Sequence, residues 1–290
     1  MTALVLQAVV SGLLMGLIYA LVAAGLSLIF GLMDVVNFAH GEMLMLSMFA
    51  VLALHGALHV DALLLLPVVA LIMFGGGVAV YRLLIARALS VASNRGMVQI
   101  FVTFGLAIFL RGAAQFAFGG EFRSINDGWL SNRTVALGPV FLPLPQVAAG
   151  LVCLLAFAGL LALSRTEFGR ALEATREDRD AVALIGIDRD RIFAFGWGIG
   201  AATVGVAGTM LSTFYYVSPS VGLNFAVIAY VTVALGGFGS MLGALAAGLL
   251  IGLVESLTAL ALEPSLKQVG MFAVYLLVLV SRPRGLFGKI

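Results

Sequence analysis

Long, continuous apolar stretches separated by short polar turns make up most of the chain. A helix needs about 20 apolar residues to cross the roughly 30 Å hydrocarbon core of a membrane, whereas the strands of a membrane barrel alternate over about 10 residues. The stretches here are continuous, so the pattern predicts an all-α, polytopic integral membrane helical bundle. Candidate segments lie at about residues 5–30, 42–58, 62–85, 97–118, 144–164, 191–215, 223–236, 243–262 and 268–281.

Four of these segments differ from the usual length of a span. The segment 5–30 is long and could be tilted or broken, and the segments 42–58, 223–236 and 268–281 are short enough to be partial or re-entrant. We therefore expect about eight or nine transmembrane segments, some of them broken or re-entrant. Eight complete spans plus one broken span is the main alternative to nine.

The composition supports a membrane protein. Hydrophobic residues account for 62% of the chain and charged residues for 10%, against about 45–50% and about 25% in soluble domains. A chain so poor in charge lacks the side chains to cover a globular surface. We therefore expect residues 1–290 to form a single membrane domain surrounded by lipid, without a soluble domain or a basic face for nucleic acid.

Charge is concentrated in one loop, residues 165–191, which holds 13 of the 30 charged side chains. Short cytoplasmic loops of membrane proteins are enriched in Lys and Arg. If this loop is cytoplasmic, twelve basic residues lie inside and three outside. The bias predicts that the N-terminus and the segment 119–145 are external and that the C-terminus is cytoplasmic.

The loop itself has the pattern of two short helices with apolar stripes. Phe168 and Leu172 are spaced i, i+4, Asp178 suits the N-cap of the second helix, and Gly186 suits the position after its end. Leu184 and Ile185 would share one exposed apolar face with Ala181. A solvated connector is one interpretation, but the uncovered apolar residues favour a surface that docks another protein.

A polar break containing Asp34, Asn37, His40 and Glu42 separates the first two apolar segments. Ionisable groups inside a membrane are costly and often functional, so the break could line the transport path or its gate. It could equally be a cytoplasmic turn in which Asp34 and Asn37 cap helix ends. A metal site is not expected, because His40 and Glu42 are only two residues apart and would not face each other on a helix.

A glycine-rich break holds Gly236, Gly237 and Gly239, again between two apolar segments. It could form a hinge or a discontinuous span near the transport path, or a tight turn between helices. Two ionisable residues, Arg111 and Glu255, stand alone in apolar segments. Each could line a cavity or pair with a neighbour, and Arg111 could instead extend towards the external face.

The chain offers no catalytic machinery of its own. Its two lysines, Lys267 and Lys289, do not lie in a G-x-x-x-x-G-K-[ST] phosphate-binding loop. If ATP drives this protein, another chain must bind and hydrolyse it. We therefore expect a transport subunit and not an enzyme.

Three motifs are found along the chain: Asn37-Phe-Ala-His-Gly-Glu42, Gly236-Gly-Phe-Gly-Ser-Met-Leu-Gly243 and Arg282-Pro-Arg-Gly-Leu-Phe-Gly288. Together they resemble the permease subunits of bacterial branched-chain amino acid ABC importers. The first span near the N-terminus resembles the shorter, LivH-type permease. In that family an E-A-A-like cytoplasmic loop docks on the ATPase. Glu173-Ala174 matches its start, whereas Thr175 replaces the second alanine and puts the docking register in doubt.

The resemblance implies a complex and a mechanism. The partners would be a second homologous permease, two ATPase subunits that bind ATP and Mg, and an external solute-binding protein, with no cofactor bound by this chain. The complex would lie in the bacterial cytoplasmic membrane and import amino acids, with branched-chain ones as the substrates that the resemblance implies, by alternating access. Urea or short amides are alternative substrates, and an ion-coupled secondary transporter or a channel is a different class to be tested.

Overall fold

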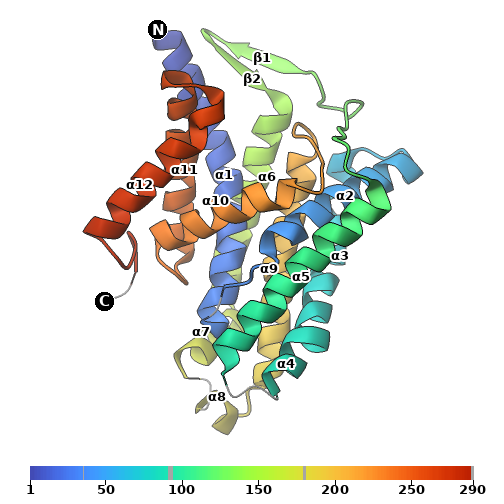
Figure 1. The fold of residues 1–290 in the computed structure, drawn as a ribbon, viewed down its shortest axis with the longest axis vertical. Coiled ribbons are helices and arrows are strands. Elements are labelled where there is room, and N and C mark those ends of the chain that lie inside the picture. The colour runs from blue at the N-terminus through green and yellow to red at the C-terminus, as the bar shows by residue number, and fades with distance from the viewer. Residues whose placement is uncertain (35, 91–93, 179–180, 289–290) are drawn as a thin grey trace.

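The computed structural model describes residues 1–34, 36–90, 94–178 and 181–288, and this part of the chain is almost entirely helical (Figure 1). The helices are α1 (Thr2–Met33), α2 (His40–Leu58), α3 (Ala62–Val80), α4 (Ala86–Ser90), α5 (Arg95–Phe118), α6 (Leu144–Ser164), α7 (Glu167–Glu177), α8 (Ala181–Leu184), α9 (Arg189–Leu211), α10 (Val221–Gly236), α11 (Met241–Ala261) and α12 (Lys267–Ser281). A π-helical turn, Tyr81–Ile85, joins α3 to α4, a 3-10 turn, Pro264–Leu266, precedes α12, and β1 (Thr134–Leu137) and β2 (Val140–Pro143) form a hairpin.

Eight helices in the described part of the chain are long and apolar enough to cross a membrane, and α10 is a shorter apolar helix. The predicted all-α, polytopic bundle is therefore confirmed. The first segment is one unbroken helix of 32 residues, so the suggested break within it is wrong. The segment predicted at 62–85 extends to Ser90, because the π-turn lets the helical backbone continue through Tyr81 instead of ending it.

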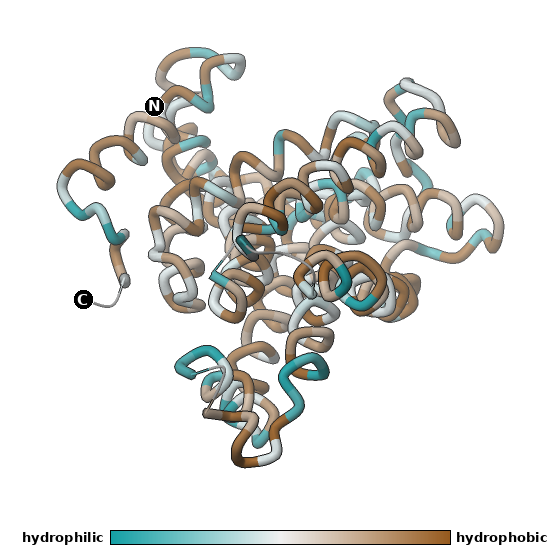
Figure 2. The backbone as a smooth tube through the Cα atoms, turned by 60° about the horizontal axis from the view of Figure 1, so that its bottom comes forward, coloured by the Kyte–Doolittle hydropathy of each residue, from teal (hydrophilic) through white to brown (hydrophobic). Residues whose placement is uncertain are grey.

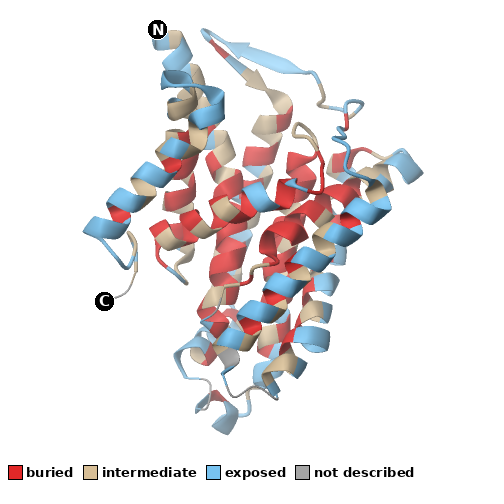
Figure 3. Ribbon diagram, viewed as in Figure 1, coloured by how far each residue is buried: buried red, intermediate tan, exposed pale blue. Residues whose placement is uncertain are grey.

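Two helices, α1 and α9, occupy the centre of the bundle, and Figure 3 shows them largely buried. From Ile18 to Met33 almost every residue of α1 is buried, because α6, α9, α10 and α11 pack around it. A helix that is apolar all round needs such an environment. By contrast, α5 and α12 expose most of their large apolar side chains, as expected for helices that contact lipid or another subunit.

Small residues bring α1 and α11 together. The carbonyl oxygen of Gly252 would lie 2.7 Å from a Cβ atom added to Gly12, and that of Gly248 would lie 2.9 Å from one added to Gly16. The two backbones therefore touch directly. Glycine pairs spaced i, i+4 thus serve close packing of helices here, as in other membrane bundles.

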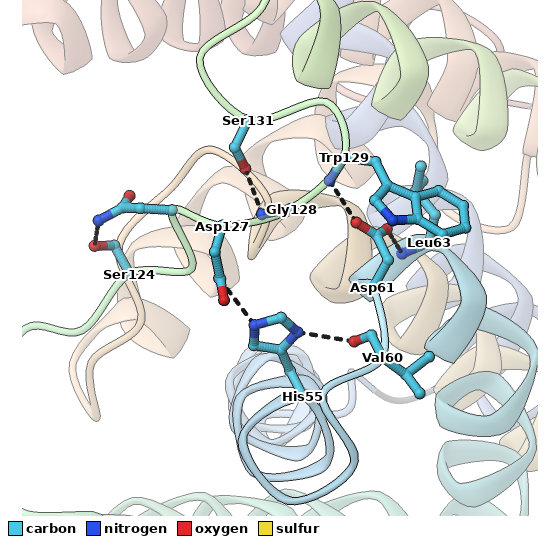
Figure 4. Close-up of polar contacts among 10 residues, drawn as sticks. His55, Val60, Asp61, Leu63, Ser124, Asp127, Gly128, Trp129 and Ser131 are labelled. Atoms are coloured by element: carbon cyan, nitrogen blue, oxygen red, sulfur yellow. Dashed lines mark hydrogen bonds and ion pairs between the residues drawn. The ribbon is translucent and has the colours of Figure 1, made fainter.

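The segment between α5 and α6 is tied to the α2–α3 turn by a polar network (Figure 4). The Asp61 carboxylate accepts hydrogen bonds from the backbone N–H groups of Leu63, at 2.8 Å, and Trp129, at 2.6 Å. His55 lies 2.8 Å from the carbonyl oxygen of Val60 and 2.9 Å from Asp127. Since both ring nitrogens of His55 face acceptors, the two hydrogen bonds form together only when the ring is protonated. The bond from His55 lowers the pKa of Asp127.

The hairpin of β1 and β2 turns at Gly138 and Pro139, with Leu137 paired to Val140. Gly138 adopts a positive φ of 60°, which the tight turn requires and which glycine allows without strain. The side chain of Gln7 in α1 bonds to both backbone groups of Phe141. The hairpin is therefore anchored beside the N-terminal end of α1.

Hydrophilic residues gather at the end of the molecule that carries α4, α7 and α8 (Figure 2). The N-terminus and the hairpin lie at the opposite end (Figure 1). This arrangement separates the basic loops from the segment 119–145, and the direction in which the chain crosses the membrane stays a prediction. Arg179, Asp180 and Lys289, which were counted among the charges, lie outside the described residues.

Candidate functional site

The polar break between α1 and α2 lies inside the bundle. Asp34 ends α1 in the left-handed conformation, with φ of 56°, and α2 begins at His40. The His40 Nε2 atom lies 2.9 Å from the carbonyl oxygen of Val22, which is about 17 Å along α1 from Met33 at a rise of about 1.5 Å per residue. The start of α2 therefore packs beside the interior of α1. Asp34 and Asn37 lie at the ends of α1 and α2, as the interpretation as a turn expected, and a role of this break in the transport path stays a prediction.

Asp34, Asn37 and Gly41 do not share a helical face, because residues 36–39 are non-helical. Hydrogen bonds within the break and from α10 satisfy polar groups of the break. The Asn37 side chain accepts a hydrogen bond from the backbone N–H of Ala39 at 3.0 Å. The Tyr230 hydroxyl of α10 donates to the carbonyl oxygen of Phe38 at 3.0 Å. Non-helical backbone at membrane depth is tolerated where such partners satisfy it.

A buried ion pair follows immediately. Glu42, in the first turn of α2, is 2% exposed, and its Oε1 atom accepts hydrogen bonds from the Nε, at 3.0 Å, and Nη2 atoms of Arg111 in α5. The other carboxylate oxygen, Oε2, is buried and has no hydrogen-bond partner among the described residues. Arg111 is 31% exposed, so the pair extends from the interior to the outer face of α5.

The amino-terminal ends of α2 and α10 meet at this pair. The carbonyl oxygen of Gly222 would lie 2.3 Å from a Cβ atom added to Gly41, and the free oxygen of Glu42 would lie 2.5 Å from one added to Gly222. Both helices begin within the bundle. Since helix N-termini carry partial positive charge, two of them converge on the carboxylate of Glu42.

The charged loop forms the two short helices that its pattern predicted. The Asp178 side chain accepts a hydrogen bond from the Ala181 N–H at 2.9 Å, and Gly186 has a φ of 83°, so the predicted cap and helix end are confirmed. Val182 is buried and anchors α8. Leu184 and Ile185 are 89% and 73% exposed, so their apolar surface is uncovered in this chain.

The other apolar stripe of the loop faces the bundle. The ring of Phe168 lies 5.7 Å from that of Phe195 in α9, and Leu172 packs against the buried cluster around Trp197. On the opposite side of α7, Glu173 is exposed and Ala174 is half-buried. The residues predicted to dock another protein therefore fall into two groups. Phe168 and Leu172 pack against the bundle, whereas Glu173, Leu184 and Ile185 are exposed.

The glycine break is directly connected to α7. Gly237 and Gly239 have φ values of 98° and 76°, and they form the turn between α10 and α11. The Arg176 guanidinium donates a hydrogen bond to the carbonyl oxygen of Gly239 at 3.0 Å, and a cavity of about 290 Å³ between α7 and this turn is lined by Phe168, Leu172 and other apolar residues.

The carboxy-terminal tail closes the other side of the same turn. The backbone N–H groups of Leu286 and Phe287 donate to the carbonyl oxygens of Leu235, at 2.8 Å, and Gly236, at 3.1 Å. The charged loop and the tail motif therefore both contact the glycine break. In the sequence these are three separate features. The Arg176 contact spans 63 residues of chain, and no spacing pattern signals it.

The second isolated ionisable residue, Glu255, also has partners. Its Oε1 atom lies 2.7 Å from the ammonium of Lys267, and its Oε2 atom accepts a hydrogen bond from Tyr19 at 2.6 Å. Glu255 and Arg111 therefore both form pairs, which was one of the alternatives open for them. Neither partner could be found from the sequence, because the pairs join residues on different helices.

These features define a multi-pass helical membrane protein in which the ends of helices bring charged groups together inside the bundle. Residues 8–280 match the family model described as branched-chain amino acid transport system / permease component. The chain belongs to this family, and it is a transport permease.

Relatives extend over almost the whole chain. It is 29% identical to the high-affinity branched-chain amino acid transport system permease protein LivH of Escherichia coli (strain K12), covering 98% of this chain and 96% of that protein. It is 30% identical to the BraD permease protein of Pseudomonas aeruginosa over the same shares. It is 33% identical to the LivM permease protein of Escherichia coli (strain K12), over 58% of this chain and 41% of that protein. No solved structure matches the chain.

Proposed function

We propose that this chain is one permease subunit of an ATP-driven importer of branched-chain amino acids in the bacterial cytoplasmic membrane. The observation that carries the proposal is the near full-length similarity to the LivH and BraD permease proteins. Similarity to LivM as well supports a pair of homologous permeases. An external solute-binding protein and two ATPase subunits, which bind ATP and Mg, complete the complex.

The division of the charged loop supports a role in ATPase docking. Leu184 and Ile185 present an apolar surface at the hydrophilic end of the molecule, and the exposed carboxylate of Glu173 lies on the neighbouring helix. Phe168 and Leu172 fix α7 to the bundle. Movement of an ATPase bound to α8 would therefore be transmitted through α7 to the helices.

Transport measurements in proteoliposomes test this function. We expect uptake of radiolabelled leucine only when the two permeases, the ATPases, the binding protein and ATP are all present. Omission of the ATPases, or a non-hydrolysable nucleotide, should abolish uptake. Uptake that persists without ATP, or that follows an imposed proton or sodium gradient, would show an ion-coupled transporter or a channel, and uptake of urea or acetamide in place of leucine would reassign the substrate.

Replacement of Arg176 by alanine should weaken the connection between α7 and the α10–α11 turn. A charge-assisted hydrogen bond contributes about 1.5–3 kcal/mol, and Arg176 makes such a bond to Gly239. We expect ATP hydrolysis by the complex to continue while the number of leucine molecules transported per ATP falls by about threefold or more.

The matched control is Arg170→Ala on the same helix, since Arg170 is 68% exposed and pairs with Glu167 on the surface. It should leave the transport ratio unchanged. Equal ratios for the Arg176→Ala variant and the wild type would refute a role of Arg176 in coupling.

A further inference from the structure

The hydrogen bonds between Glu42 and Arg111 are arranged unusually for a buried ion pair. Two of the three guanidinium nitrogens of Arg111 donate to one oxygen of Glu42, whereas the other oxygen, Oε2, is buried without a hydrogen-bond partner among the described residues. The buried Glu255 carboxylate also has an oxygen that makes no hydrogen bond among these residues, but that oxygen lies 2.7 Å from the Lys267 ammonium, and the other oxygen accepts a hydrogen bond from Tyr19. The Glu42 pair has an unused hydrogen-bond acceptor, which a cationic donor would satisfy.

The surroundings of the pair give access from outside the subunit. Arg111 is 31% exposed, and Phe104 and Ile108, at i−7 and i−3 on the same face of α5, are exposed beside it. A partly exposed arginine is costly in hydrocarbon, and such residues usually face a bundle interior or a water-filled cavity. This face therefore suits contact with a second permease and the path between the two subunits.

The local electrostatics favour a bound carboxylate. Arg111 supplies a planar guanidinium, which binds carboxylates in two-point geometry. The N-termini of α2 and α10 meet at Gly41 and Gly222 beside it, and the ends of discontinuous membrane helices are suited to anionic substrate groups. Glu42 occupies this position in the present structure.

We propose that Glu42 and Arg111 form the recognition site for the zwitterionic backbone of an α-amino acid, an inference that rests on the proposed function. The substrate carboxylate takes the place of the Glu42 carboxylate on Arg111, and the substrate ammonium donates to Glu42. A zwitterion can open the pair without leaving either buried charge uncompensated. A neutral ligand such as urea or an amide leaves both charges without a counter-ion, which is costly in a buried site.

The test is ATP-dependent uptake of radiolabelled leucine by the complete complex in proteoliposomes. The variants are Glu42→Gln, Arg111→Gln, the double variant Glu42→Gln/Arg111→Gln and the matched control Glu255→Gln. Each single variant at the site should lower leucine uptake by roughly 100-fold or more, since it removes one of the two charges that bind the zwitterion. The control variant should retain uptake within about threefold of the wild type.

The double variant separates recognition from structural support. It removes both charges, keeps similar side-chain volumes and leaves no unpaired charge, so its unfolding temperature in detergent should return towards that of the wild type. Leucine uptake should nevertheless stay as low as in the single variants. Uptake restored in the double variant would identify a purely structural pair and overturn the inference, as would normal uptake in the single variants.

The same experiment distinguishes the two levels of the proposal. A wild-type complex that does not take up leucine contradicts the proposed function and the inference together. A wild-type complex that transports leucine while every variant also transports it contradicts the inference alone.

Discussion

Replacing Leu184 and Ile185 together by aspartate is expected to abolish association of this permease with its ATPases. The two side chains are 89% and 73% exposed, and burying each in an interface contributes about 2 kcal/mol. Loss of both contributions corresponds to a roughly 1,000-fold weaker complex, and the two new carboxylates add a desolvation cost. The measurement is co-purification of the ATPases with the permease in detergent.

The fold should tolerate this change, because neither side chain packs in the core and Val182, which anchors α8, is unchanged. The matched control places aspartate at Val135 and Leu137, two exposed apolar residues of β1 at the opposite end of the molecule. That variant should retain its ATPases. Unchanged co-purification of the Leu184→Asp/Ile185→Asp variant would refute docking through α8.

Replacing Gly248 by leucine is expected to have the largest effect on stability. A Cβ atom at this position would lie 2.5 Å from the backbone nitrogen and 2.6 Å from the Cα atom of Ala20 in α1. A backbone cannot move aside as a flexible side chain does, so α1 and α11 must separate. Overpacking of this kind costs about 2–4 kcal/mol, and we expect the unfolding temperature in detergent to fall by roughly 10 °C.

Gly105 in α5 provides the control for this substitution. It also lies in an apolar spanning helix, but a Cβ atom added there has no neighbour within 4 Å. The Gly105→Leu variant should unfold within a few degrees of the wild type. Similar melting of the two leucine variants would show that the contact between α1 and α11 does not limit the stability of the bundle.

The difference between these two glycines illustrates the limit of sequence reasoning. Glycine at i, i+4 spacing predicts close packing, and the pairs at Gly12/Gly16 and Gly248/Gly252 do pack closely. The sequence gives no indication of which helix each pair contacts. That partner depends on the arrangement of helices that are separated by more than 200 residues of chain.

The polar break shows a second limit. Its residue types correctly indicated an interruption between two helices, because Asp, Asn, His and Glu are costly in hydrocarbon. Its position in the bundle could not be predicted, because it depends on contacts with α1 and α10. His40 bonds to the carbonyl oxygen of Val22 in α1, and Tyr230 of α10 donates to the carbonyl oxygen of Phe38. For the same reason pairing of Arg111 with a neighbour was only one of several possibilities, and Glu42 could not be named as its partner.

The sequence by itself determined the helical membrane class, most of the spans, the two short helices of the charged loop and the family, because hydropathy, capping residues and motifs are local properties. Only the tertiary structure decided that α2 begins beside the interior of α1 and next to the start of α10, that Glu42 meets Arg111, and that Arg176 joins the charged loop to the glycine turn. These contacts join distant segments. They form because packing the apolar helices brings the few polar groups to where they can satisfy one another.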